Sequence, residues 1–389
     1  MTPSRLLPLT MSVLLSLSAC ATERSKVISL SLWLDTHERE SLFFKGLIAR
    51  MEKDLPHIRL RLRFMPFEDL KPRFLGQVGE TREPDIVYMM NDWVGELAEQ
   101  QVLRPIAQPL NDILPAAASS MQYQGQNYGV PFVFQTIALL YNRDLIDQPP
   151  HHFQELKPRA TDSGVYPLIY DQRNFYYHAP WFHACGGQLF DANGRFVLKR
   201  EPLRRSLQDA YALQQGQIVP AGASYSVMLN LFAAGQSQLM ISGPWSMGLL
   251  QENKLSYGVA PLPRNSCSET PRSFIGVKGF GVNRLSRHPE AVEEVIAYLT
   301  SAESQQQALK ALDNLPVHQR VYQQPLEPAQ QGFYAQLQHG VPLPNHPMMK
   351  DVWQEMNWLL GQVFDGQPLE ARLDEALERL QRRAGSYER

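Results

Sequence analysis

The stretch Val27-Ile-Ser-Leu-Ser-Leu-Trp-Leu34 places an apolar side chain at every second position, which is the pattern of a β-strand with one buried face. Apolar residues between positions 42 and 51 then recur at helical spacing, and Pro56 closes this amphipathic helix. Residues 58–64 alternate again, and a second helical stretch leads to the strand-like run Asp85-Ile-Val-Tyr-Met89. The order strand, helix, strand, helix, strand predicts a parallel sheet with helices on its faces, which is a doubly wound lobe of the α/β class.

Polar and aromatic side chains follow the first and third of these strands. They are Asp35, His37, Glu38, Asp92 and Trp93. Ligands of doubly wound sheets bind at the carboxyl ends of the strands, so we expect a binding site here. His37 and Glu38 have an alternative role as caps of the helix that begins near residue 40, and Asp92 has one as a helix N-cap.

The N-terminus has the pattern of an export signal. Arg5 precedes an apolar stretch from Leu6 to Leu17, which is too short to span a bilayer and ends in Leu-Ser-Ala-Cys20. This segment resembles the bacterial lipobox, which implies a lipoprotein signal peptide over residues 1–20 and lipidation of Cys20. We therefore expect a periplasmic or extracytoplasmic protein that is lipid-anchored to a membrane, and Ala21 favours the outer membrane of a Gram-negative cell. The alternative is an ordinary signal peptide.

Composition excludes several classes of function. The 389 residues include 37 basic and 39 acidic ones, so the net charge of −2 recruits neither nucleic acid nor an anionic membrane. The chain is longer than a single hydrophobic core usually accommodates, so its length predicts two lobes. No hydrolase, metalloprotease or nucleotide-binding motif occurs, and the histidines form no cluster, so we expect no catalytic residue, no metal and no cofactor. Cys185 and Cys267 either pair or stay buried in an oxidising compartment.

A short apolar strand delivers a tryptophan into a loop in the run Gly235-Gln-Ser-Gln-Leu-Met-Ile-Ser-Gly-Pro-Trp245. A sugar ring has an apolar face that stacks on an indole while its hydroxyls stay free for hydrogen bonds. Trp245 therefore indicates carbohydrate binding. In the alternative interpretation, Gly-Pro only turns the chain and Trp245 fills the edge of a core.

Several motifs resemble, in order and spacing, those of the family 1 extracellular solute-binding proteins, across nearly the whole mature chain. They are Glu83-Pro-Asp-Ile-Val-Tyr88, Tyr128-Gly-Val-Pro-Phe132, Leu140-Tyr-Asn-Arg-Asp-Leu145, Cys185-Gly-Gly-Gln-Leu-Phe-Asp191, Gly243-Pro-Trp245 and Gly258-Val-Ala-Pro-Leu-Pro263. The resemblance implies the type II periplasmic binding protein fold, in which two doubly wound lobes joined by a multi-strand hinge close over a ligand. The lobes would comprise residues 27–133 plus 263–314 and residues 134–262 plus 315–389.

The resemblance also implies a function. The protein would be a monomeric, non-enzymatic receptor that binds a sugar and delivers it to the permease subunits of an ABC transporter. Matching the family's sugar-binding positions adds Gln135, Tyr176 and Trp353 to Asp92, Trp93 and Trp245. Tyr176, Trp245 and Trp353 would stack on sugar rings, while Asp92, Gln135 and Asp35 bind hydroxyls. Core packing is the alternative role of Trp353.

Three alternative functions remain at this stage. The same fold binds glycerol phosphate or another small polar solute if arginines, such as Arg143, Arg173 or Arg264, lie in the cleft. A ligand-sensing receptor would dock on a signalling partner rather than on a permease. A glycosidase would need two carboxylates across the cleft, for which Asp92 with Glu96 or Asp35 are the candidates.

Overall fold

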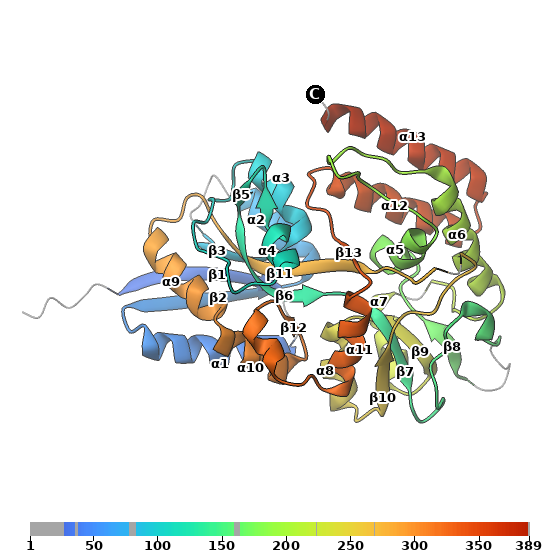
Figure 1. The fold of residues 1–389 in the computed structure, drawn as a ribbon, viewed down its shortest axis with the longest axis horizontal. Helices are drawn as coiled ribbons and strands as arrows, with labels where there is room; N and C mark the ends of the chain where they lie inside the picture. The colour runs from blue at the N-terminus through green and yellow to red at the C-terminus, as the bar shows by residue number, and fades with distance from the viewer. Residues whose placement is uncertain are drawn as a thin grey trace, which may run out of the picture.

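The computed structural model describes residues 27–35, 38–77, 83–158, 164–222, 224–267 and 269–387. The predicted signal segment with Cys20 lies outside the described residues, as do His37 and the side chain of Glu38. The described chain forms two lobes that lie side by side, each built around its own β-sheet (Figure 1).

The first lobe combines a mixed sheet with helices and short 3-10 turns (η). Its elements are β1 (Ile28–Asp35), α1 (Glu38–Asp54), β2 (Ile58–Met65), α2 (Phe67–Gln77), β3 (Ile86–Met90), η1 (Asn91–Trp93), α3 (Val94–Glu99), α4 (Pro115–Ser120), β4 (Gln122–Tyr123), β5 (Gln126–Asn127), β6 (Gly129–Gln135), β11 (Phe274–Val282), α9 (Pro289–Leu299), α10 (Ala302–Leu312), β12 (Leu315–Pro316), η4 (Gln319–Gln323) and β13 (Val341–Pro342).

The second lobe is built in the same way around a smaller sheet. Its elements are β7 (Ala138–Asn142), η2 (Phe153–Glu155), β8 (Tyr166–Ile169), α5 (Phe175–Ala184), α6 (Arg200–Gln215), α7 (Tyr225–Ala233), β9 (Ser237–Ser242), η3 (Pro244–Ser246), α8 (Met247–Glu252), β10 (Tyr257–Ala260), α11 (Pro328–Leu337), α12 (Met349–Phe364) and α13 (Leu369–Tyr387).

The first sheet has the strand order β12-β6-β11-β3-β1-β2, and β13 pairs with β11. β1 runs parallel to both β2 and β3, with Ile28 opposite Ile58 and Leu32 opposite Ile86. The β-α-β-α-β unit predicted from the alternation is therefore present. Because β1 and β3 are parallel, their carboxyl ends meet at one edge of the sheet, where Asp35 ends β1 and Asp92 follows β3.

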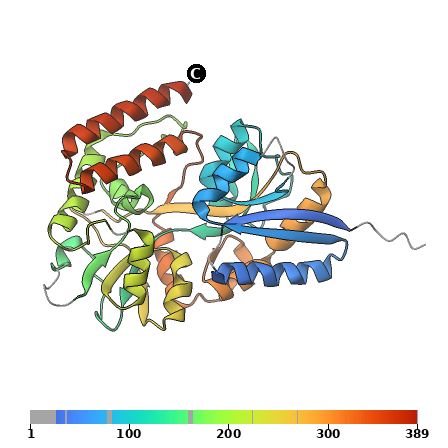
Figure 2. The same cartoon turned by 180° about the vertical axis from the view of Figure 1, so that it is seen from behind.

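The second sheet has the order β10-β7-β9-β8, in which β7 is antiparallel to β9 and β10 while β8 is parallel to β9. Helices α12 and α13 pack on each other and on α6 along one side of this lobe, as both ribbon views show (Figures 1 and 2). α13 buries Leu373, Ala376 and Leu380 against its neighbours, which confirms the predicted terminal packing helix.

The chain passes between the lobes at several points, and β13 returns to the first sheet between α11 and α12. β6 of the first sheet leads directly to β7 of the second, β10 leads back to β11 through residues 261–273, and β12 precedes α11, which packs on β10. A hinge between two lobes is usually built from a few connecting segments of this kind. The first sheet takes β12 and β13 from the range 315–389 that was predicted for the second lobe, and the exact residue bounds of the lobes stay a prediction.

Two buried glutamine side chains hold these crossing segments. Gln336 accepts from the backbone N–H of Leu262 at 2.8 Å and donates to the carbonyl of Pro271 at 2.9 Å. Gln305 accepts from the backbone N–H groups of Val317 and His318 at 2.8 and 2.9 Å. Buried backbone donors require partners, so these amides keep the crossings ordered.

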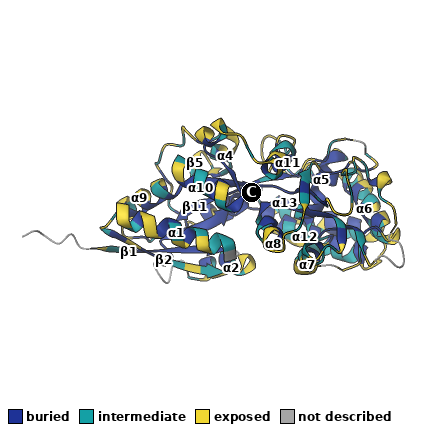
Figure 3. Ribbon diagram, turned by 90° about the horizontal axis from the view of Figure 1, so that it is seen from below, coloured by how far each residue is buried: buried dark blue, intermediate teal, exposed yellow. Residues whose placement is uncertain are grey.

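Burial follows the layers: most strands of the two sheets are buried, the edge strand β2 alternates between buried and exposed residues, and exposed residues cover the outer faces of helices such as α4, α6 and α9 (Figure 3). Among the described residues, no helix combines the length and the apolar content that crossing a bilayer requires.

Candidate functional site

A cavity of about 1180 Å³ lies between the two lobes. Seven residues of the predicted site are described with their side chains, and all seven line this cavity: Asp35, Asp92, Trp93, Gln135, Tyr176, Trp245 and Trp353. The structure therefore brings together residues from six separate parts of the chain. That they contact a ligand stays a prediction.

Three partly buried aromatic side chains of the second lobe form one continuous wall. The ring centroid of Tyr176 lies 6.3 Å from that of Trp245 and 6.5 Å from that of Trp353. Tyr176 is held in the first turn of α5, where the N-cap side chain of Asn174 accepts from its backbone N–H at 3.0 Å. The wall offers flat apolar surface to the cavity, as stacking on sugar rings requires.

The Gly-Pro-Trp sequence explains the position of Trp245. A Cβ atom on Gly243 would lie 2.0 Å from Cζ3 of Trp245, so only glycine leaves room for the indole over the backbone. Pro244 starts η3 and turns the chain directly after β9. Trp245 is partly buried, packs against the hydrophobic core and also lines the cavity, so its stacking on a sugar ring stays a prediction.

Asp92 is 9% exposed and accepts a hydrogen bond from the indole Nε1 of Trp353 at 2.8 Å. Burial raises the pKa of this carboxyl above its ordinary value, although Lys71 and the Trp353 hydrogen bond act in the opposite direction. The side chain of Asp92 caps no helix: neither η1 nor α3 has a side-chain cap bond. Trp353 therefore joins α12 to the first lobe rather than only packing in a core.

A charged cluster lies at the first-lobe side of the cavity. Lys278 Nζ lies 2.6 Å from the carboxylate of Asp35. Burial raises the pKa of nearby Glu40 to about 7, with Lys278 lowering it and Asp35 raising it. Burial opposes the charge of Lys278, but Asp35 and Glu40 outweigh this effect and raise its pKa.

Glu40 and Lys278 are site residues that the sequence reasoning missed. Each left a signal, since Glu40 follows the predicted ligand loop by two residues and Lys278 is the single charged residue in the apolar strand Phe274–Val282. A lone charge in a strand that is buried on both faces usually has a partner and a function.

The cavity carries a surplus of acidic groups. Among its described lining residues, six carboxylic side chains face only two basic ones: Asp35, Glu40, Glu68, Asp92, Asp171 and Glu252 against Arg39 and Lys278. A wall of this composition repels an anionic ligand, whereas a neutral or a cationic ligand meets no such repulsion.

The arginines considered for a phosphate site lie elsewhere. None of Arg143, Arg173 and Arg264 is among the residues that line the cavity. Arg173 forms an ion pair with Asp365, and Arg264 donates to Thr270 Oγ1 at 3.4 Å. The prediction that clustered arginines would mark a phosphorylated ligand therefore finds no support.

The carboxylates considered for a glycosidase are engaged in other contacts. Glu96 does not line the cavity; its carboxylate pairs with Lys71 and, at 3.3 Å, with Lys350. Asp35 is tied to Lys278. Within the described part of the chain, no group of three or more His, Cys, Asp or Glu residues is arranged to hold a metal ion.

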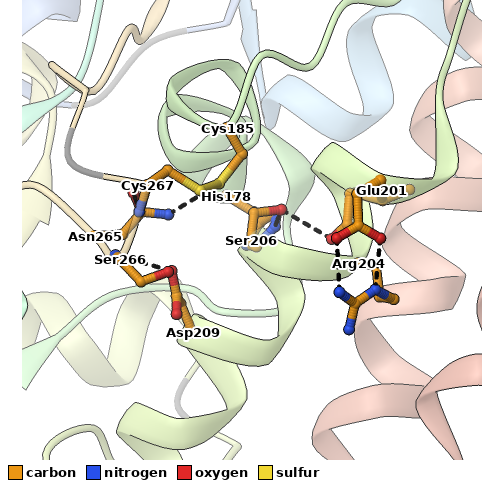
Figure 4. Close-up of a disulfide and its surroundings, with 10 residues drawn as sticks. His178, Cys185, Glu201, Arg204, Ser206, Asp209, Asn265, Ser266 and Cys267 are labelled. Carbon is orange, nitrogen blue, oxygen red and sulfur yellow. Dashed lines mark hydrogen bonds and ion pairs between the residues drawn. A yellow bond between two sulfur atoms is a disulfide. The ribbon is translucent and has the colours of Figure 1, made fainter.

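Cys185 and Cys267 form a disulfide, which resolves the alternatives that the sequence left open (Figure 4). Cys185 ends α5, and Gly186 follows with φ +82°, a left-handed conformation that closes the helix. Asn265 donates to Cys185 Sγ at 3.3 Å beside the bond (Figure 4). The disulfide thus ties α5, which carries Tyr176, to the segment that crosses into β11. A shallower hollow of about 720 Å³ adjoins it on the outside of the second lobe.

Comparison with known proteins identifies the family. The model of the bacterial extracellular solute-binding proteins matches residues 46–332, and the chain belongs to this family. Its fold is the type II periplasmic binding protein fold that the motifs predicted.

Individual relatives are distant but extensive. A maltotriose-binding protein of Pyrococcus abyssi is 25% identical over 372 residues, which cover 90% of this chain and 80% of that protein. A maltooligosaccharide ABC transporter solute-binding lipoprotein of Streptococcus pneumoniae serotype 4 is 23% identical, with 73% of this chain and 72% of that protein covered. The solved maltose/maltodextrin-binding domain of Bdellovibrio bacteriovorus bound to maltotriose has a TM-score of 0.85 at 23% identity, covers 92% of this chain and 99% of its own, and shows the same fold.

Proposed function

We propose that this protein is the substrate-binding receptor of an ABC importer and that it binds a neutral oligosaccharide between its two lobes. The observation that carries the proposal is the aromatic wall of Tyr176, Trp245 and Trp353 in an inter-lobe cavity of about 1180 Å³. Stacked rings remove water from apolar sugar faces, while Asp92, Gln135 and the other polar lining groups bind hydroxyls.

The energy required is modest. A micromolar receptor needs about 8 kcal/mol of net binding free energy, which several stacked rings and hydrogen bonds in a preformed cleft supply. Binding would close the lobes without breaking a bond, and the closed form would then dock, as a monomer, on the permease. The acidic lining favours this reading over a glycerol phosphate receptor.

A calorimetric titration of residues 27–389 with neutral oligosaccharides, glycerol phosphate and polyamines tests the ligand class. We expect binding of one or more neutral oligosaccharides and no binding of glycerol phosphate. Trp245→Ala should abolish the binding. Trp358→Ala is the matched control, because Trp358 lies outside the cavity and packs under Arg379, 4.2 Å from its ring. A response to phosphorylated compounds alone, or to polyamines alone, would contradict the proposal.

The lipid anchor is a separate proposal that rests on the sequence around Cys20 and on the description of a streptococcal relative as a lipoprotein. Metabolic labelling with a fatty-acid analogue tests it. Label should enter the wild-type protein and be absent from Cys20→Ser. Equal labelling of both proteins, or of neither, would contradict lipidation at this position.

A further inference from the structure

Phe67 is exposed on the wall of the cavity. Among the described residues, five large apolar side chains stand out as exposed, and of these only Phe67, which is 43% exposed, lines the cavity. It is the first residue of α2, directly after Pro66. A large ring exposed singly on a convex surface needs no explanation, but a ring exposed inside a concave site is positioned to be covered by a ligand.

Trp93 braces this ring from behind. The ring centroids of Phe67 and Trp93 lie 5.4 Å apart at an interplanar angle of 35°, and Trp93 itself is only 5% exposed. Lys71 Nζ lies 5.9 Å from the Trp93 ring and completes the support. Trp93, which was predicted to contact the ligand, lines the cavity but exposes only 5% of its surface and packs against Phe67. A ring supported in this way loses little conformational freedom on binding.

Adjacent residues of η1 connect Phe67 to the aromatic wall. Asp92 accepts the indole hydrogen bond of Trp353, and Trp93, the next residue, packs on Phe67. Phe67 therefore faces the cavity from the first lobe while Tyr176, Trp245 and Trp353 face it from the second. A volume of about 1180 Å³ exceeds the roughly 300–1,000 Å³ of typical small-molecule sites, so there is room for several sugar rings.

Polar groups flank the ring. Lys278 Nζ lies 5.8 Å from the Phe67 ring centroid and is paired with Asp35, while Glu68 follows Phe67 on the cavity wall. On the second lobe, Asn230 of α7 lines the same cavity. A flat apolar face with donors and acceptors at its edge is the arrangement that binds a pyranose unit.

We propose that Phe67 is a separate stacking platform for one further ring of the oligosaccharide and that it sets the length of ligand that the protein prefers. This inference rests on the proposed function. Saccharides long enough to reach Phe67 gain binding energy from it, whereas shorter ones that fill only the Tyr176, Trp245 and Trp353 wall do not.

The test measures dissociation constants of wild type, Phe67→Ala, Phe67→Leu and Phe67→Trp for two series of two to five sugar units, malto-oligosaccharides and galacto-oligosaccharides. For the longer members we expect Phe67→Ala to weaken binding about tenfold, which corresponds to about 1.4 kcal/mol. The disaccharide should bind within about twofold of wild type. Phe67→Trp should retain the length preference, and Phe67→Leu, apolar but not flat, should lose most of it. Leu42→Ala, 62% exposed on α1 and outside the cavity, is the control.

The outcomes separate the two proposals. If wild type binds neither series, the proposed function fails in this form, and the platform fails with it. If wild type binds but Phe67→Ala weakens every length equally, or none, the platform alone is overturned. Full retention by Phe67→Leu would also overturn it, because a flat ring would then be unnecessary. Melting temperatures close to that of wild type show that the variants are folded.

Discussion

The indole nitrogen of Trp353 lies 2.8 Å from the carboxylate of Asp92, although 261 positions separate the two residues. One turn earlier on α12, Lys350 reaches Glu96 at 3.3 Å. The same face of α12 therefore meets η1 and α3 of the first lobe twice. Since Asp92 and Trp353 also line the cavity, this contact couples the position of the aromatic wall to the first lobe.

Trp353→Phe should lower both stability and sugar affinity. The variant keeps an aromatic face but leaves the buried carboxylate of Asp92 without the indole donor, which costs about 1–3 kcal/mol of unfolding free energy. Urea unfolding with and without ligand measures both effects. Trp358→Phe, outside the cavity, is the control. Equal unfolding free energies for Trp353→Phe and wild type would show that the hydrogen bond contributes nothing.

Gly243→Ala should impair binding nearly as strongly as Trp245→Ala, although Gly243 does not line the cavity. The added Cβ would lie 2.0 Å from the indole and force Trp245 out of place. Gly361→Ala on α12, where a Cβ meets nothing within 4 Å, is the matched control and should bind normally. Titration calorimetry measures the affinities. Unchanged binding by Gly243→Ala would contradict this prediction, because it would mean that the Trp245 indole can bind the ligand from another orientation.

Part of this arrangement was predictable from sequence, and the rest depends on tertiary context. β2 alternates as predicted because it is the edge strand of its sheet, whereas β1 is central and buries Ser31 and Trp33 on its second face. Leu42, assigned to the apolar face of the first helix, is 62% exposed, while Phe44 is fully buried. Helical spacing alone did not show which of these neighbouring residues faces the core.

The candidate site shows the same division. Motif matching brought together residues that do line the cavity, because each motif sits at the end of a strand or the start of a helix. Phe67, Glu40 and Lys278 were missed because their role depends on distances across the sheet, such as the 2.6 Å between Lys278 and Asp35. No spacing along the chain encodes such a distance.

Two buried histidines should make the protein sensitive to acid. Burial lowers the pKa of His178 to about 3 and that of His183 to about 4, where the ordinary value is 6.5. Their contribution to stability is complete above pH 6.5 and is lost as the pH falls toward these values. The reason is that both histidines become protonated in the unfolded chain while they stay neutral in the native state. Each group contributes a slope of about 1.4 kcal/mol per pH unit.

Melting temperatures between pH 7.5 and 4.5 measure this loss. His178→Gln combined with His183→Asn keeps hydrogen-bonding groups toward Ser206 and the Arg272 carbonyl, and should flatten the pH dependence. His288→Gln, exposed before α9, should leave it steep. A wild-type melting temperature that stays constant across this range would contradict the prediction.

Reduction of the Cys185–Cys267 bond should destabilise the protein substantially. The bond closes a loop with a sequence separation of 82, for which chain entropy predicts a loss of about 4–5 kcal/mol as an upper value. The double variant Cys185→Ser, Cys267→Ser should match the reduced wild type in urea unfolding and should not respond to reductant. An identical midpoint for oxidised and reduced wild type would contradict this prediction.

Arg39 should slow the release of ligand. It lies on α1 of the first lobe and donates at 2.6 Å to Gln251 on α8 of the second, and Gln251 in turn donates to Asp313 at 3.0 Å. Arg39→Met keeps the apolar stem but loses this link, so stopped-flow dissociation of a bound oligosaccharide should become about three- to tenfold faster with little change in the association rate. Gln251→Met, outside the cavity, should have the same effect.

The control for this link is Arg50→Met. Arg50 lies on the same helix but bonds to Gln307 of α10 within the first lobe, so its loss should leave the dissociation rate unchanged. If Arg39→Met accelerates release and Gln251→Met does not, Arg39 acts on the ligand directly. If neither variant does, the contact between α1 and α8 forms without holding the lobes together.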